Sequence, residues 1–196
     1  MDGPGCEPYL DAFLREPVAA LSSLAYVAAA LLGRPAPPMY ALLVAGIGVG
    51  SFVQHGPNPP LADLAHDLPL AGTLLYVAAD SIARLTGRPH RTWWWVVPLG
   101  GLVPLILAAP GLADGVQVGM AGVAVLASVA RAWAHTDERT RIALALGLLA
   151  AGGAIGRLSV SGGPLCEPDS LLQGHAVWHL MSAAALAVLA PIMRRA

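Results

Sequence analysis

Charged residues are scarce in this sequence, and lysine is absent from it altogether. Only 12% of the 196 residues are charged and 56% are hydrophobic, whereas a soluble domain carries roughly 25% charged residues. The formal net charge is −1, and no basic patch with interleaved aromatic residues is present, so we predict no nucleic-acid partner. Because the few charges are spread over the whole length, we predict a polytopic membrane protein.

The sequence also lacks the features of a removed secretory leader. The first apolar segment follows a polar, acidic start, without a basic stretch before it or a small-residue cleavage site after it. No internal repeat or low-complexity tail divides the chain. We therefore expect residues 1–196 to form a single domain, with 1–15 as an amino-terminal segment outside the membrane.

Seven apolar segments alternate with short turns rich in glycine and proline. A helix needs roughly 20 apolar residues to cross a bilayer, and open strands cannot satisfy their backbone groups in lipid. We therefore predict an all-α bundle of seven transmembrane helices. Their approximate limits are Glu16–Leu32, Met39–His55, Asp67–Leu85, Trp93–Ala109, Gly115–Trp133, Thr140–Leu158 and Leu171–Ile192.

The arginines favour one orientation of this bundle. Only Arg15 and Arg157 lie on one side of the predicted membrane, and the other nine of the 11 lie on the opposite side. Positive residues are concentrated in cytoplasmic loops, so we predict an amino terminus outside the cell membrane and a cytoplasmic carboxyl terminus. The nine are Arg34, Arg84, Arg88, Arg91, Arg131, Arg139, Arg141, Arg194 and Arg195.

The last apolar segment contains two histidines, His175 and His179, at positions i and i+4. On a helix this spacing puts both imidazoles on one face, one turn apart. Ionisable groups inside membrane spans usually mark a functional site, and two imidazoles so placed can share a metal ion. The structural alternative is two interfacial histidines that hydrogen-bond to loops.

The predicted topology brings further polar residues to the depth of this histidine pair. Ser51 and His55 end the second segment on the outer side, and Asp67 opens the third segment there. With His175 and His179, His55 would complete the three-imidazole set of a catalytic zinc site, which keeps one position open for a water. If the side chain of His55 points away, His66 is the alternative ligand.

Two of these residues suit roles in acid–base and oxyanion chemistry. Asp67 could accept a proton from a metal-activated water and pass it to a leaving amine. Ser51 could orient Asp67 or donate a hydrogen bond to a developing oxyanion. Structural roles remain as alternatives, because a serine can bond to a helical carbonyl and an aspartate is favoured near a helix start.

Two further features are interpreted as structural. Asp80 and Arg84 stand at i and i+4 toward the inner end of the third segment, which predicts an ion pair within that helix. Trp178 lies between His175 and His179 and is expected to pack against a neighbouring helix.

The two cysteines, Cys6 and Cys166, both fall on the predicted outer side. Disulfides persist in oxidising compartments, so we predict that a disulfide ties the amino-terminal segment to the loop over the candidate site. The alternative is a pair of free thiols.

The order of these motifs resembles the CREST superfamily of seven-helix membrane hydrolases, and within it alkaline ceramidase and its bacterial relatives. Ser-x-x-x-His is followed by Asp at the head of the next helix and by His-x-x-x-His in the seventh. The stretches Cys6-Glu7, Glu16-Pro17, Leu21–Tyr26 and Gly174–His179 add to a likeness that covers nearly the whole chain.

The resemblance implies a zinc ion held by His55, His175 and His179, with Ser51 and Asp67 as the other catalytic residues. It also implies hydrolysis of the ceramide amide, and the Cys6–Cys166 disulfide matches a family feature. A family calcium site is matched in part: Glu7 and Glu16 could supply two ligands and Asp2 or Asp11 another, but the tryptophan and asparagine ligands are missing.

Three functions are therefore weighed. The leading hypothesis is a zinc-dependent amidase acting on ceramide or another N-acyl membrane lipid, in the bacterial inner membrane because the loops are short. The alternative is a non-enzymatic metal-binding receptor or sensor of the same fold. A transporter is disfavoured, because the polar residues cluster at one end of the bundle. No oligomeric state is predicted.

Overall fold

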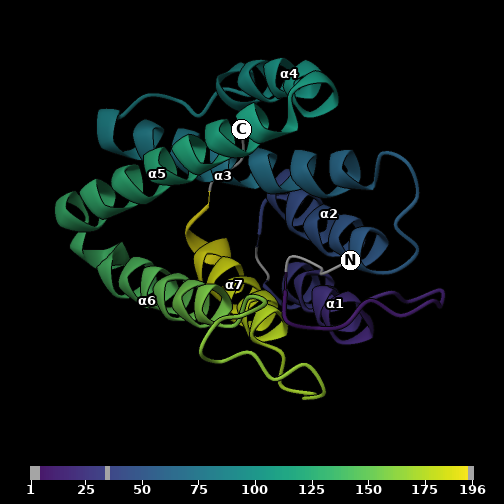
Figure 1. The fold of residues 1–196 in the computed structure, drawn as a ribbon. Coiled ribbons are helices and arrows are strands. Elements are labelled where there is room, and N and C mark those ends of the chain that lie inside the picture. Colours follow the sequence, from purple (N-terminus) through teal and green to yellow (C-terminus); the bar gives the residue numbers. More distant parts are fainter. Residues whose placement is uncertain (1–4, 34–35, 194–196) are drawn as a thin grey trace.

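The computed structural model describes residues 5–33 and 36–193, and within these ranges it contains helices and no strands (Figure 1). The seven α-helices confirm the all-helical prediction. They are α1 (Pro17–Leu32), α2 (Pro38–His55), α3 (Ala62–Thr86), α4 (Trp93–Ala108), α5 (Pro110–Ala134), α6 (Thr136–Leu158) and α7 (Gly174–Leu189), and a short 3-10 helix, η1 (Ala190–Ile192), extends α7.

The predicted first residues of four helices, α3, α5, α6 and α7, are wrong by several residues. α3 begins at Ala62, so Asp67 lies in its second turn rather than at its head. α5 begins at Pro110 and α6 at Thr136, whereas α7 begins only at Gly174. The hydropathy pattern placed the start of α3 too late, because the polar residues Asp63 and His66 lower the hydropathy of its first turns. A helix can nevertheless begin with polar residues, and Asp63 is favoured in a first turn.

Four of the helices are long and apolar enough to cross a membrane: α3, α5, α6 and the Gly174–Ile192 stretch of α7 and η1. α1 and α4 are shorter apolar helices of 16 residues each. Within the apolar windows of α5 and α6, only 22% and 17% of the residues are buried. Such large exposed apolar surfaces are normal only where lipid or a partner covers them, which is consistent with an integral membrane protein.

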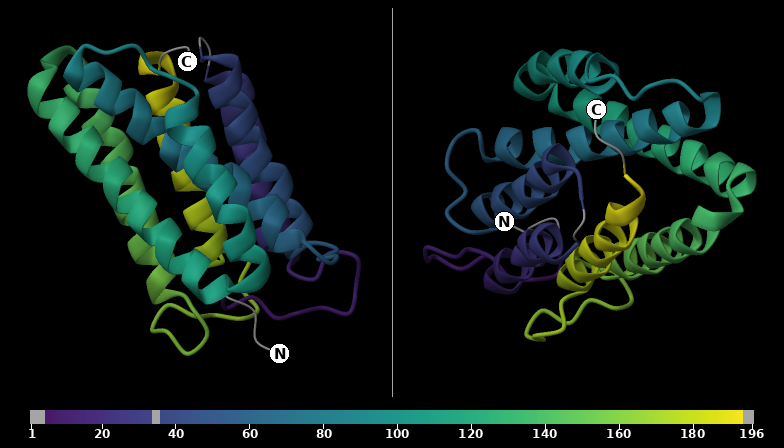
Figure 2. Two further views of the ribbon diagram at one scale, coloured as in Figure 1. Left: turned by 90° about the horizontal axis from the view of Figure 1, so that it is seen from above. Right: turned by 180° about the vertical axis from the view of Figure 1, so that it is seen from behind.

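α7 packs beside α6, the helix that precedes it, and also beside α1, which is far from it in the chain (Figures 1 and 2). α1, α2 and α3 pack in order, α5 packs on α3, and α4 lies outside α3 and α5. α1 and α2 approach closely, since a Cβ at Gly48 would lie 2.9 Å from the carbonyl oxygen of Ser23. This close approach brings the polar residues of α1 and α2 together at the end of the bundle where α7 begins.

A buried ionic cluster lies at the opposite end of the bundle, and it corrects the predicted Asp80–Arg84 pair. Asp80 Oδ2 accepts a 2.6 Å hydrogen bond from Arg131 Nη1 of α5. Arg131 Nε donates to Glu138 Oε2 at 2.5 Å, and Arg131 Nη2 donates to the carbonyl oxygen of Ile192 at 2.7 Å. Arg84 donates instead to Glu138 Oε1 at 3.2 Å.

We call these side chains the arginine network: Arg131, Asp80, Glu138 and Arg84, together with the Ile192 carbonyl. Arg131 and Asp80 are each 0% exposed, so one of the nine arginines used to predict the orientation lies inside the bundle. Three more of the nine lie outside the described residues, as does one candidate calcium ligand. These four residues are Arg34, Arg194, Arg195 and Asp2.

Candidate metal centre

Three histidine side chains from two helices converge at the end of the bundle where α7 begins. His55 is the last residue of α2, and His175 and His179 occupy the first turns of α7. One ring nitrogen from each lies within 4.8 Å of the others, and the Nε2 atoms of His55 and His175 are 3.1 Å apart. His55 and His179 are 3% and 2% exposed, and His175 is half-buried.

This spacing fits a shared metal ion. Two nitrogens at ~2.0–2.1 Å from a tetrahedral zinc lie about 3.4 Å apart, close to the observed separation of the His55 and His175 Nε2 atoms. An imidazole set also suits copper, iron or nickel, so the donors indicate a metal class rather than one element. Without a metal, the same contact would be an N–H···N hydrogen bond between the two rings.

Glu16 holds the outer nitrogen of His55. Its Oε2 lies 2.7 Å from His55 Nδ1, and its side chain is almost completely buried. The backbone N–H of Glu16 also donates to the His55 carbonyl at 2.9 Å, which joins the start of α1 to the end of α2. A carboxylate on the outer N–H of a histidine fixes the tautomer and turns the other nitrogen toward a metal.

Replacing Glu16 with glutamine is expected to lower the affinity for zinc about 10- to 100-fold, which is the usual effect of losing such an outer partner. The neutral amide keeps the shape of the side chain but no longer stabilises the His55 imidazole as a metal ligand. Competition against a zinc chelator measures this change. Glu167→Gln is the matched control, because Glu167 is an exposed glutamate in the loop before α7. Equal affinities for wild type and Glu16→Gln would contradict the assigned role of Glu16.

A set of serines surrounds His179. Ser22 Oγ lies 2.9 Å from His179 Nδ1, and Ser23 Oγ lies 3.4 Å from the same nitrogen. Ser51 Oγ lies 3.4 Å from His179 Nε2 and 2.8 Å from Ser23 Oγ. The structure thus places Ser51 beside a nitrogen of the histidine cluster. Sequence reasoning assigned no role to Ser22, Ser23 or the Glu16–His55 contact.

Asp67 and His66 lie on α3 and contact each other. His66 Nδ1 is 2.8 Å from Asp67 Oδ1, and both side chains are largely buried. Within residues 5–33 and 36–193, the only group of three or more potential ligands this close contains His55, His175 and His179. His55 rather than His66 is therefore the third imidazole of the cluster, and the catalytic role of Asp67 stays a prediction.

The amino-terminal segment is fastened over this end of the bundle. A disulfide joins Cys6 to Cys166, with 5.3 Å between their Cα atoms. A Cβ at the neighbouring Gly5 would lie 3.5 Å from the His175 Cβ, so the segment passes directly against the histidine cluster. The Glu7 carboxylate accepts hydrogen bonds from the backbone N–H groups of Val18 at 2.7 Å and Ala19 at 2.9 Å.

The contacts of Glu7 and Glu16 bear on the calcium prediction. Glu7 caps the start of α1, where free N–H groups favour a carboxylate, and Glu16 contacts His55. Both carboxylates thus have protein partners, and the calcium site stays a prediction.

Replacing Cys166 with serine is expected to destabilise the protein by about 2–5 kcal/mol, because the disulfide closes a loop with a sequence separation of 160. Thermal unfolding in detergent without reductant measures the loss. The Cys6→Ser, Cys166→Ser double variant should lose no more than the single variant, since both remove one bond. An unchanged unfolding temperature in the single variant would show that the disulfide adds no stability.

The start of α7 is held in place by the loop before it. The side-chain amide of Gln173 donates to the carbonyl oxygens of Glu167, Pro168 and Ser170. A Cβ at Gly174 would overlap the side chain of Ser159 at the end of α6. Trp178 lies against Gly153 and Gly156 of α6, as expected of a packing residue. These contacts fix the position of the first turn of α7, and with it the position of His175.

A scan against protein-family models and a search of curated proteins find no match to this chain. The evidence for the function of this chain therefore comes from the residues of the candidate metal centre.

Proposed function

We propose that this protein is a zinc-dependent membrane amidase that hydrolyses the amide bond of ceramide or a related N-acyl lipid. The observation that supports it most directly is the convergence of His55, His175 and His179 at one end of a helical bundle that includes four helices of membrane length. The substrate class rests on the resemblance to alkaline ceramidase described above.

The proposal includes seven membrane spans, an outer amino terminus and a cytoplasmic carboxyl terminus in a bacterial inner membrane. Among the described arginines, four exposed ones lie on the predicted cytoplasmic side and two on the other side, which supports this orientation: Arg88, Arg91, Arg139 and Arg141 against Arg15 and Arg157. The disulfide supports it as well, because it lies at the end with the histidines and disulfides persist on the oxidising side of a membrane. α1 and α4, at 16 residues each, would span ~24 Å and so cross a locally thinned bilayer.

The residues around the histidine cluster have separate roles in this proposal. A zinc ion bound there would supply a water of lowered pKa and polarise the amide carbonyl. Ser51, whose Oγ is 3.4 Å from His179 Nε2, would donate a hydrogen bond to the carbonyl oxygen as negative charge develops on it. Asp67 would take a proton from the attacking water and give it to the leaving amine. Glu16 would keep His55 oriented.

A metal-binding receptor or sensor is the alternative function. It remains because the same three imidazoles, His55, His175 and His179, could hold a metal ion that takes no part in hydrolysis.

Metal analysis combined with a hydrolysis assay tests the proposal and separates it from the alternative. Protein purified in detergent should contain one zinc ion per chain. It should also release fatty acid from ceramide or another N-acyl lipid. A chelator should abolish the release, and added zinc should restore it. Absence of zinc would contradict the metal centre, whereas bound zinc without hydrolysis of any N-acyl lipid would favour the receptor.

A further inference from the structure

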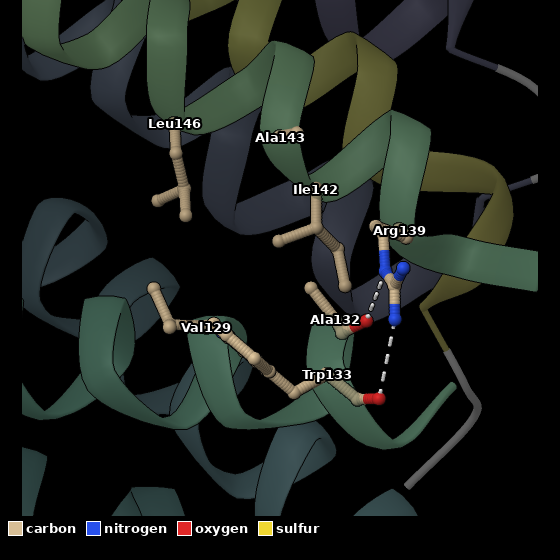
Figure 3. Close-up of a pocket in the computed structure, with 7 residues that line it drawn as sticks. All are labelled: Val129, Ala132, Trp133, Arg139, Ile142, Ala143 and Leu146. Atoms are coloured by element: carbon tan, nitrogen blue, oxygen red, sulfur yellow. Dashed lines mark hydrogen bonds between the residues drawn. The ribbon is translucent and has the colours of Figure 1, made fainter. Parts of the chain in front are cut away.

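A groove of about 350 Å³ lies between α5 and α6, near the loop that joins them (Figure 3). Its lining residues are apolar except for one arginine, and they include Val129, Ala132, Trp133, Arg139, Ile142 and Leu146. The volume is within the range of small-molecule sites, which is roughly 300–1,000 Å³. The groove therefore has the size and the lining of a site for an apolar molecule with one negatively charged group.

Arg139 is held at one end of this groove. Its Nε donates to the Ala132 carbonyl oxygen at 3.0 Å, and its Nη2 donates to the Trp133 carbonyl oxygen at 3.5 Å, as the dashed lines in Figure 3 show. A guanidinium has five N–H donors, so these two bonds fix the group and leave further donors for a ligand. Val129 and Leu146 lie at the other end of the groove (Figure 3).

The acidic residues next to Arg139 are paired with other arginines. Glu138 accepts hydrogen bonds from Arg131 and Arg84, and Asp137 Oδ2 lies 3.8 Å from Arg84 Nη2. The charge of Arg139 is thus not neutralised by these two carboxylates. An anionic ligand is the complementary partner for such a group.

The position of the groove on two membrane-length helices indicates where the ligand comes from. α5 and α6 are both long and apolar enough to span a bilayer, and they meet at His135. Trp133 is 78% exposed beside that loop, as is typical of tryptophans at a membrane–water interface. Leu146 lies seven residues beyond Arg139, which is about 10 Å deeper along the helix axis.

We propose that this groove binds an anionic phospholipid of the surrounding leaflet. Arg139 hydrogen-bonds to the phosphate at headgroup depth, Trp133 borders the headgroup, and one acyl chain lies along Val129 and Leu146. The site lies on helices that contribute no histidine to the metal centre, and it does not depend on the proposed hydrolase activity.

Native mass spectrometry of the detergent-purified protein, titrated with phosphatidylglycerol or phosphatidylcholine, tests the lipid site. The wild type should retain phosphatidylglycerol in preference to phosphatidylcholine. Arg139→Gln should bind phosphatidylglycerol about tenfold more weakly, because it loses a charge-assisted hydrogen bond. Arg141→Gln is the matched control: Arg141 is an exposed arginine two residues further along α6, on another face of the helix. It should bind as the wild type does.

A second variant tests the apolar part of the groove. Ala143 is an exposed residue that lines the groove, and phenylalanine at this position should block the acyl chain and weaken binding while Arg139 is intact. Equal retention of both lipids, or equal losses in Arg139→Gln and Arg141→Gln, would overturn the proposal. The same spectra would also overturn the proposal if they showed a dimer of the wild type that the Ala143→Phe substitution dissociates, because a second copy of the chain would then occupy the groove.

Discussion

If the protein is the proposed zinc amidase, replacing His179 with alanine should remove the zinc and abolish lipid hydrolysis. His179 is 2% exposed and supplies one of the three clustered imidazoles found in the described part of the chain. Loss of an outer hydrogen-bond partner already weakens metal binding about 10- to 100-fold, so loss of a direct ligand should weaken it more than 100-fold. Metal content after dialysis and the rate of fatty-acid release measure the two effects.

His66→Ala is the matched control for this variant. His66 is a histidine at the same end of the bundle, on α3, but it belongs to a pair with Asp67 and not to the histidine cluster. The control should keep its zinc. His179→Gln preserves more side-chain volume and separates loss of a ligand from loss of packing. If His179→Ala retained a full complement of zinc, the three-histidine centre would be wrong.

Replacing Arg131 with methionine should cause a large loss of stability. Arg131 is 0% exposed and bonds to Asp80, Glu138 and the Ile192 carbonyl, so it connects α5 to α3, α6 and the end of α7. Removing one partner of a buried ion pair costs about 3–5 kcal/mol, because the buried Asp80 carboxylate loses the guanidinium that compensates its charge. Thermal unfolding in detergent measures the effect.

Two further variants show whether the loss of stability in Arg131→Met comes from the lost charge or from the changed packing. Arg141→Gln removes an exposed arginine and should change stability by no more than about 1 kcal/mol. Adding Asp80→Asn to Arg131→Met removes the buried negative charge and should restore part of the lost stability. If the double variant were as unstable as Arg131→Met alone, the loss of stability would come from packing rather than from the loss of the Arg131–Asp80 ion pair.

The arginine network also shows why sequence spacing alone predicted the wrong pairs. Asp80 and Arg84 are one helical turn apart, which favours an ion pair within the helix. In the structure each pairs with another helix, because Arg131 of α5 and Glu138 of α6 are held against α3 at this depth. A buried carboxylate gains more from a buried guanidinium than from one at the surface, so tertiary packing decided the partners.

The helical class and the candidate metal ligands could be predicted without coordinates. Apolar segments of membrane length leave the chain little choice but helix. The i, i+4 spacing of His175 and His179 puts both on one face whatever surrounds it. The alternating direction of consecutive apolar helices puts His55 at the depth of this pair, and the structure decided between His55 and His66 as the third imidazole. These are local or topological constraints, and they do not depend on side-chain packing.

Only the tertiary structure decided which groups contact the imidazoles. Glu16 and His55 are 39 residues apart, and Ser22 and His179 are 157 apart, so their contacts depend on how closely α1 packs against α2 and α7. The sequence likewise does not distinguish Arg139 from Arg141, because both are arginines beside the same predicted loop. The rotation of α6 against α5 puts one beside the groove and not the other. Periodicity determines which residues share a helix face, but the packing of one helix on another determines what that face meets.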